Sequence, residues 1–410
     1  MQRELLNATA ILAIIVFLAT YAVIGFGKLP GLRLDRAGAA LIGASLMLAC
    51  GVLSPEEAYK AIDLDTLVLL LGMMIVVAHL RVSGLFRVVS GWVARHARRP
   101  VALLATVILV SGLFSAFLVN DAVCIALAPL VFELATSLKR NPVPYLLAVA
   151  MASNVGSAAT ITGNPQNIMI GSFSRIPYGN FAAALSPIAA IGLCLTFGML
   201  VLFFRNEFLK DGKLQREARR VHYSKPLARK SLLVTVSMIA AFFLGQPVSK
   251  AAIVAAALLL ITRRVKPGKI YREIDFPLLM LFAGLFIVVA GIEKAVLTRG
   301  AFAYAKTLHL ERVSILTAVS ALLSNLVSNV PAVLVLKPFV LQLNNPQHAW
   351  LTLAMSSTLA GNFTILGSVA NLIVVQRARR DGVEISFWDY FKVGAPLTVL
   401  TLIVGIVFLR

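Results

Sequence analysis

Apolar stretches of about 20 residues recur along the whole chain, and they constrain its fold more than any other feature of the sequence. A helix of that length crosses a hydrocarbon core that is ~30 Å thick. We interpret ten stretches as membrane crossings, at residues 8–27, 36–53, 64–82, 146–173, 180–205, 231–246, 249–263, 275–294, 348–376 and 385–409. The apolar runs are continuous rather than alternating, which excludes a β-barrel. The sequence therefore predicts an all-α polytopic membrane protein that lies in a lipid bilayer.

The composition excludes the main alternatives. The chain is 59% hydrophobic and 14% charged, whereas soluble domains carry about 25% charged residues. Intrinsic disorder would require low hydrophobicity. Three Cys are too few for a disulfide framework or a cysteine-rich metal cluster. The net charge of +20 suggests nucleic acid at first sight, but the basic residues lie between the apolar stretches, so we expect no nucleic-acid partner.

Two further apolar stretches, 101–137 and 311–342, are each about twice the length of one crossing and are interrupted by polar residues. The first interruption contains Asn120 and Asp121, and the second contains Ser328 and Asn329. Each stretch could form two short crossings or a re-entrant hairpin. We expect re-entrant hairpins with these polar residues at their tips.

The basic residues predict the orientation. If both long stretches return to the side from which they started, 27 of the 38 Lys and Arg residues lie in loops on one side. The positive-inside rule makes that side the cytoplasm. Two short crossings per stretch would give the same result, so the charges do not distinguish them from hairpins. We expect a multi-pass protein of the bacterial inner membrane, whose first apolar segment is a span and not a cleaved signal peptide.

The two halves of the chain resemble each other, in the segments 1–205 and 231–410 that flank a basic linker at 206–230. Three blocks match in the same order, with offsets of 212, 209 and 204 residues. The matched pairs include Gly72 with Gly284, Asn120 with Asn329, and Gly163 with Gly367. Five crossings plus one hairpin per half would turn the second half over. Inverted repeats with interrupted helices are typical of secondary transporters, with the interruptions near the midplane.

The interruptions lie in the stretches 146–173 and 348–376, which we therefore predict to be broken helices. Gly163 and Pro165 break the first, and Gly367 marks the break in the second. Freed backbone groups cannot be satisfied by lipid, so they must face protein, water or a ligand. Polar side chains at the hairpin tips and breaks are the candidate substrate-binding residues: Asn120, Ser153, Asn154, Thr160, Asn164, Asn167, Ser328, Asn329, Thr364, Ser368 and Asn371.

Two charged residues within the long stretches are candidates for coupling to protons. Asp121 follows the first hairpin tip, and an intramembrane carboxylate is by default a functional hypothesis. Lys337 lies two turns past the second tip and could snorkel outward or pair with a carboxylate. We find no paired-His zinc motif and no Gly-rich phosphate loop with Lys. We therefore expect no enzyme activity, no metal site and no cofactor.

This combination of hairpins with Asn at the tips and broken helices with a Gly-Asn-Pro turn resembles the ion transporter superfamily. The tip Asn120-Asp121 and the segment Leu366–Leu372 are similar to the arsenite/antimonite permease branch. The segment Ser153–Asn167 looks more like the anion and citrate carriers, the divalent anion:sodium symporters. The resemblance implies alternating access, a homodimer in many members, and a separate ATPase subunit in some.

Two transport mechanisms remain open. In the first, a site of hydroxyls and amides exports arsenite or antimonite in exchange for protons carried by Asp121. In the second, freed N–H groups hold a small organic or inorganic anion such as citrate, a dicarboxylate or sulfate, and carbonyls beside them hold sodium. The absence of Arg at the breaks disfavours large polyanions.

Overall fold

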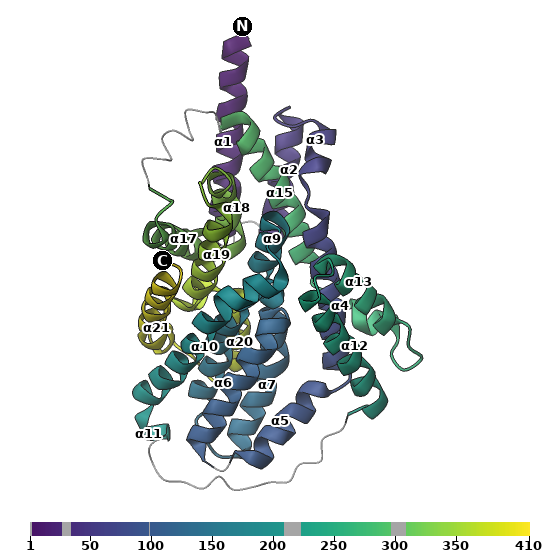
Figure 1. Ribbon diagram of the computed structural model, residues 1–410, viewed down its shortest axis with the longest axis vertical. Helices are drawn as coiled ribbons and strands as arrows, with labels where there is room; N and C mark the ends of the chain where they lie inside the picture. Colours follow the sequence, from purple (N-terminus) through teal and green to yellow (C-terminus); the bar gives the residue numbers. More distant parts are fainter. Residues whose placement is uncertain (1, 27–33, 98, 209–222, 297–308) are drawn as a thin grey trace.

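The computed structural model describes residues 2–26, 34–97, 99–208, 223–296 and 309–410. Within these residues the chain is helical and contains no strand (Figure 1). The part of the linker at 209–222 lies outside the described residues. Seven of the described helices are long and apolar enough to cross a membrane by themselves. The prediction of an all-α polytopic membrane protein is thus confirmed.

Twelve of the described α-helices lie between residues 2 and 243. They are α1 (Gln2–Phe26), α2 (Arg36–Ala49), α3 (Pro55–Ala61), α4 (Leu64–Val82), α5 (Leu85–His96), α6 (Pro100–Phe117), α7 (Asn120–Ser137), α8 (Pro142–Ser157), α9 (Pro165–Ser174), α10 (Tyr178–Phe203), α11 (Arg205–Phe208) and α12 (Lys225–Phe243). The last of them, α12, begins at Lys225 within the predicted linker 206–230 and continues into the second predicted repeat.

The remaining helices follow in an order similar to that of α2 to α10. They are α13 (Val248–Leu260), α14 (Pro267–Tyr271), α15 (Phe276–Val296), α17 (Val313–Val327), α18 (Asn329–Val340), α19 (Pro346–Leu359), α20 (Val369–Arg380) and α21 (Phe387–Phe408). The two long apolar stretches fold as helix pairs, α6 with α7 and α17 with α18, whose turns lie at the polar tips. Their re-entrance into the membrane stays a prediction.

Three Asn-Pro dipeptides begin helices and explain where the chain restarts after a turn. The side chains of Asn141, Asn164 and Asn345 accept hydrogen bonds from the backbone N–H groups of Val143, Asn167 and His348, at 3.0, 2.8 and 3.2 Å. The proline that follows each Asn occupies the first helical turn, where its missing N–H group costs nothing. The sequence Gly163-Asn164-Pro165 therefore ends a 3-10 turn and starts α9.

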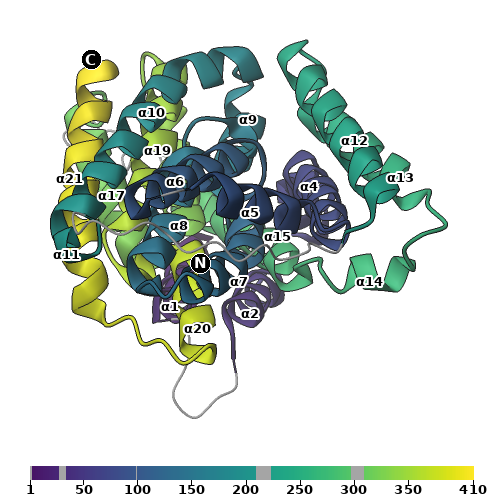
Figure 2. The ribbon, with the colours of Figure 1, turned by 90° about the horizontal axis from the view of Figure 1, so that it is seen from below.

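The helices form two groups, with most contacts inside each group. The first group, here called the scaffold group, contains α1, α2, α4, α12, α13 and α15. The second, the core group, contains α6 to α10 and α17 to α21. Figure 2 shows α12 and α13 at one side of the molecule and α10 and α21 at the other.

The scaffold group contains a pair of close helix crossings related by the sequence repeat. A Cβ atom added to Gly72 of α4 would lie 2.8 Å from the carbonyl carbon of Ala252 in α13. A Cβ atom added to Gly284 of α15 would lie 2.6 Å from the carbonyl carbon of Ala40 in α2. Both the glycines and their alanine partners are 212 residues apart. Close backbone approach through small residues is the usual packing of membrane helices.

Candidate functional site

The two predicted breaks lie against each other inside the core group. Helix α8 ends at Ser157 and α9 begins at Pro165, with one 3-10 turn at Ile161–Gly163 between them. Helix α19 ends at Leu359 and α20 begins at Val369, with 3-10 turns at Ala360–Asn362 and Ile365–Gly367 between them. Helices α8 and α19 each contact α20 or α9 of the other half as well as each other. The breaks thus bring segments about 200 residues apart in sequence into one site.

An asparagine closes each break in the same way. The Nδ2 group of Asn167 donates to the carbonyl oxygens of Ser157 and Thr160, at 3.2 and 3.0 Å. The Nδ2 group of Asn371 donates to the carbonyl oxygens of Gly361 and Thr364, at 2.7 and 3.1 Å. All three pairs of equivalent residues are 204 apart. Each amide therefore replaces the helical hydrogen bonds that its break removes.

Glycine is required at the first break because the backbone of the chain folds back on itself there. A Cβ atom added to Gly163 would lie 2.1 Å from the carbonyl oxygen of Ser157. At the second break a Cβ atom added to Gly367 would lie 2.9 Å from the carbonyl oxygen of Gly361 and equally far from Oδ1 of Asn325. The two predicted helix-break glycines thus occupy equivalent places, and the first is more tightly enclosed.

Asn154 of α8 joins the two halves of the site. Its Oδ1 atom accepts from Nδ2 of Asn120 and from Oγ of Ser368, both at 3.0 Å. Its Nδ2 group donates to Oδ1 of Asn362 and Oδ1 of Asn371, both at 2.9 Å. An amide has two donor hydrogens and two acceptor lone pairs. All four are used, so this buried side chain is fully satisfied.

Thr358 of α19 is the equivalent of Asn154 at the offset of 204, and it makes the corresponding contacts. Its Oγ1 atom accepts from Nδ2 of Asn164 at 3.1 Å and donates to Oδ1 of Asn167 at 3.4 Å. Asn164 also donates to Oγ of Ser157 at 2.9 Å. We did not single out Thr358 or Asn362 from the sequence. The repeat offset applied to Asn154 would have indicated Thr358.

The hairpin tips lie beside the breaks and present oxygen atoms that have no partner. Asn120 is 4% exposed and Asn329 is 9% exposed, and the Oδ1 atom of each lacks a hydrogen bond. Three more buried oxygens near the tips are unpartnered: Oγ of Ser115, Oγ of Ser324 and Oδ1 of Asn325. Buried polar atoms are nearly always hydrogen-bonded in folded proteins. The three amide oxygens can thus accept from a ligand that has donor groups or a positive charge, and the two hydroxyl groups can donate as well as accept.

The other sequence candidates have diverse surroundings. Ser153 contacts Sγ of Cys124 at 2.9 Å and donates to the carbonyl oxygen of Ala150 at 2.9 Å. Thr160 donates to the carbonyl oxygen of Ala116 in α6. The backbone of Ser328 has φ +78°, which produces the turn at the second tip. Thr364 takes part through its carbonyl oxygen.

The two candidate coupling residues lie in different places. Asp121 of α7 is half-buried and lies near the backbone N–H of Ala370, in the first turn of α20. Its carboxylate is thus placed at a helix N-terminus, where negative charge is favoured. Lys337 lies away from the breaks, with its Nζ atom 3.9 Å from Oε1 of Glu293 in α15. Glu293 was missed because it lies near the end of a predicted crossing, where charges are common.

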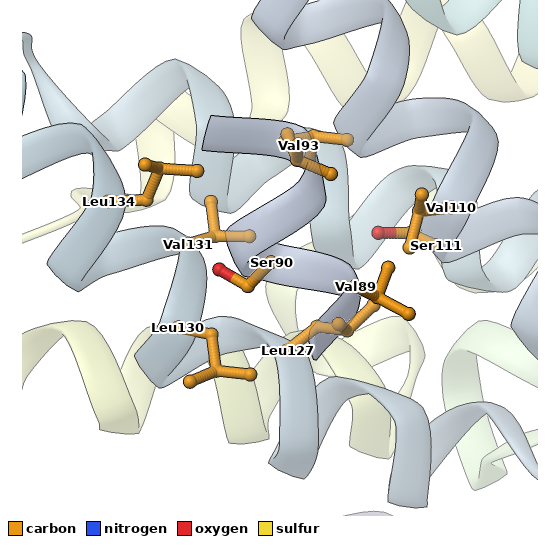
Figure 3. A pocket seen from close by; sticks show the side chains of 10 residues that line it. Val89, Ser90, Val93, Val110, Ser111, Leu127, Leu130, Val131 and Leu134 are labelled. Atoms are coloured by element: carbon orange, nitrogen blue, oxygen red, sulfur yellow. The ribbon is translucent and has the colours of Figure 1, made fainter. Parts of the chain in front are cut away.

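A small cavity elsewhere in the core group is apolar and does not extend the site. It lies between α5, α6 and α7 and holds about 20 Å³ (Figure 3). Its lining is mostly Val and Leu side chains, with the hydroxyl groups of Ser90 and Ser111 among them. That volume is enough for one water molecule. Such a water would satisfy Oγ of Ser111, which has no protein partner.

These features define a class, a membrane transporter built around two interrupted helices, and the comparisons agree. Residues 21–360 match the family of citrate transporters, so the chain belongs to that family. It is 30% identical to the silicon efflux transporter LSI3 of Oryza sativa subsp. japonica over 93% of each chain. It is 25% identical to the putative transporter arsB of Dictyostelium discoideum, over 92% of this chain and 87% of that one.

A solved structure supports the fold. The YdaH transporter of Alcanivorax borkumensis, described as having an unusual topology, superposes with a TM-score of 0.57. The match covers 98% of this chain and 97% of that one, at 16% sequence identity. The whole chain thus has the fold of a known transporter, which agrees with its resemblance to the ion transporter superfamily.

Proposed function

We propose that this protein is a secondary active transporter that exports arsenite or antimonite, as neutral hydroxides, in exchange for protons by alternating access. The observation that carries the proposal is the set of unpartnered acceptor oxygens at the two hairpin tips. A hydroxide such as arsenous acid is small, largely uncharged near neutral pH, and rich in O–H donors. Its O–H groups would complete the amide oxygens of Asn120, Asn325 and Asn329, whereas a carboxylate brings only acceptors and would leave these three oxygens unpaired.

The polarity of the breaks supports an uncharged substrate. The segments 153–167 and 358–371 contain Asn, Gln, Ser and Thr but no charged residue. Neutral hydrogen bonds give modest affinity, which a carrier needs in order to release its cargo. The name of one relative, a silicon efflux transporter, points the same way, because silicon in water is also a neutral hydroxide. We assign substrate contact to Asn120, Asn329 and the amides and hydroxyls of the two breaks.

Asp121 is the proposed proton carrier. It is the acidic residue at the hairpin tips, and Val330 holds the equivalent position in the second half. It lies near the backbone N–H of Ala370 in the first turn of α20, beside Ser368 and Asn371. A proton on Asp121 would weaken the attraction between its carboxylate and the N-terminus of α20, and would so link protonation to the position of α20. Sodium is the alternative coupling ion.

A second candidate function is the uptake of citrate or another small anion with sodium or protons. The family to which the chain belongs favours it. Helices α9 and α20 also each begin at a break, and helix N-termini favour anions. In this reading the unpartnered tip oxygens would bind sodium. A homodimer and a separate ATPase subunit remain proposals that rest on the resemblance.

Counterflow in proteoliposomes tests which substrate is carried. Purified protein is loaded with unlabelled arsenite, silicate, citrate or sulfate, and the entry of the same labelled solute is measured without an ion gradient. We expect exchange of arsenite and not of citrate, and the variant Asn329→Ala should reduce it. Exchange of citrate alone, in a sodium-dependent manner, would support the second candidate.

A further inference from the structure

Five side chains connect the core group to the scaffold group near the N-terminal end of α4 and the C-terminal end of α15. They come from α9, α15, α18 and the N-cap residue of α4, and we call them the latch. They are Asp63, Ser172, Phe173, Glu293 and Lys337. Lys337 lies eight residues beyond Asn329, which is about 12 Å along α18 from the hairpin tip. The latch is therefore separate from the substrate site but shares helices with it.

The central contact of the latch is an ion pair. The Nζ atom of Lys337 in α18 lies 3.9 Å from Oε1 of Glu293 in α15 and 4.7 Å from the ring centroid of Phe173 in α9. The side chains of Lys337 and Glu293 are 27% and 30% exposed. An ammonium group near an aromatic face and a carboxylate is attracted to both. Lys337 thus links α9, of the first predicted repeat, and α18, of the second, to α15.

The ion pair between Glu293 and Lys337 contains no hydrogen bond. Oε1 of Glu293 is buried and has no hydrogen-bond partner, because 3.9 Å is too long for one. Tyr21 of α1 lies within electrostatic range of Glu293, and its hydroxyl group donates to the carbonyl oxygen of Pro331 in α18 at 3.2 Å. A pair held this loosely can separate at less cost than one with ideal geometry.

A second polar contact lies next to the first along α9. Oγ of Ser172 lies 3.0 and 2.8 Å from the two carboxylate oxygens of Asp63, which caps the N-terminus of α4. The ring of the next residue, Phe173, lies 6.2 Å from the ring of Phe286 in α15. Helices α9 and α18 of the core group are thus both tied to the scaffold group at this end.

We propose that the Glu293–Lys337 pair is a positioning element of the transport cycle that holds the core group against the scaffold group in this conformation. It must separate whenever α18 moves along α15, and it re-forms when the cycle returns. The inference rests on the proposed function, because it assumes that the two groups move relative to each other. A purely structural pair would instead stay closed throughout the cycle.

The distance between the two groups tests this inference without any substrate. Spin labels are attached at Leu64→Cys on α4 and Leu341→Cys after α18, two exposed positions, after Cys50, Cys124 and Cys194 have been replaced. We expect one main distance in the parent protein. Glu293→Gln should add a population that differs by about one helical turn, ~5 Å. The exchange of charges in Glu293→Lys with Lys337→Glu should restore the parent distribution.

The neighbouring pair provides the matched control. Lys294, the next residue on α15, lies 2.6 Å from Oε2 of Glu57 in α3. Helix α3 follows α2 and contacts α15, so this pair lies on the scaffold side. Glu57→Gln should leave the distances unchanged. Equal distributions for Glu293→Gln, Glu57→Gln and the parent would refute the latch. Altered distances without flux of any substrate would refute the proposed function and leave the latch intact.

Discussion

Substitution of alanine for the two break glycines should have very different effects, although the two positions are equivalent in the repeat. At Gly163 the added Cβ lies 2.1 Å from the oxygen of Ser157 and 2.7 Å from its Cα. Those atoms belong to the backbone and must move by roughly 1 Å to reach van der Waals distance. At Gly367 the nearest contacts are at 2.9 Å, and one of them is the movable side chain of Asn325.

The energies follow from these distances. Overpacking in a rigid core costs about 1–3 kcal/mol. The backbone shift at Gly163 also disturbs the bonds that Asn164 and Asn167 donate to the oxygen of Ser157, at ~1 kcal/mol each. We therefore expect Gly163→Ala to lower the free energy of unfolding by about 3–5 kcal/mol and Gly367→Ala by ~1 kcal/mol.

Unfolding in mixed micelles, followed by tryptophan fluorescence, measures both variants. Trp350 of α19 is fully buried and reports on the core group. Gly198, where an added Cβ meets open space, is the control position for alanine. Equal losses at Gly163 and Gly367, or losses no larger than that at Gly198, would refute the reasoning about the tight first break.

Three further predictions concern single side chains. Asn154→Ala should lower the free energy of unfolding by about 3–5 kcal/mol, because four buried hydrogen bonds are lost. Asn141→Ala, the control, removes one helix cap and should lower it by ~1 kcal/mol, and comparable losses in the same unfolding assay would contradict the prediction. Asp121→Asn should abolish the response of arsenite flux to a proton gradient while counterflow persists, and an intact gradient response would remove Asp121 from the coupling mechanism. The hydrogen bond from Lys294 lowers the pKa of Glu57 in α3, so the small contribution of this pair to stability is present above the ordinary pKa of glutamate and is lost as the pH falls through the lowered value. The difference in stability between Glu57→Gln and the parent should therefore disappear in acid, and a difference that grows in acid would contradict this sign.

Much of the site could be predicted from the sequence because polar residues are rare in apolar crossings. Gly163, Pro165 and Asn167 stand out there, and their chemistry of breaking and restarting a helix is local. The tip residues Asn120 and Asn329 could be found for the same reason. The structure brings the tips and breaks together, as expected of elements that meet at a common site.

Other contacts could not be predicted, because they join residues far apart in the chain. Thr358 looks like an ordinary hydroxyl in a helix until α9 is placed against α19. Asn362 became central only through its bond with Asn154, 208 residues away. Glu293 has no distinguishing local pattern, and its importance depends on the position of α18. The repeat boundaries and the inverted orientation stay predictions, supported by the shared offset of the Gly72 and Gly284 crossings.

Accumulation of arsenite in everted membrane vesicles, under an imposed proton gradient and without sodium, tests the central claim most directly. The account predicts accumulation that collapses when a protonophore is added and that is lost in Asp121→Asn. No arsenite accumulation in sodium-free buffer, together with sodium-driven accumulation of citrate, would contradict it.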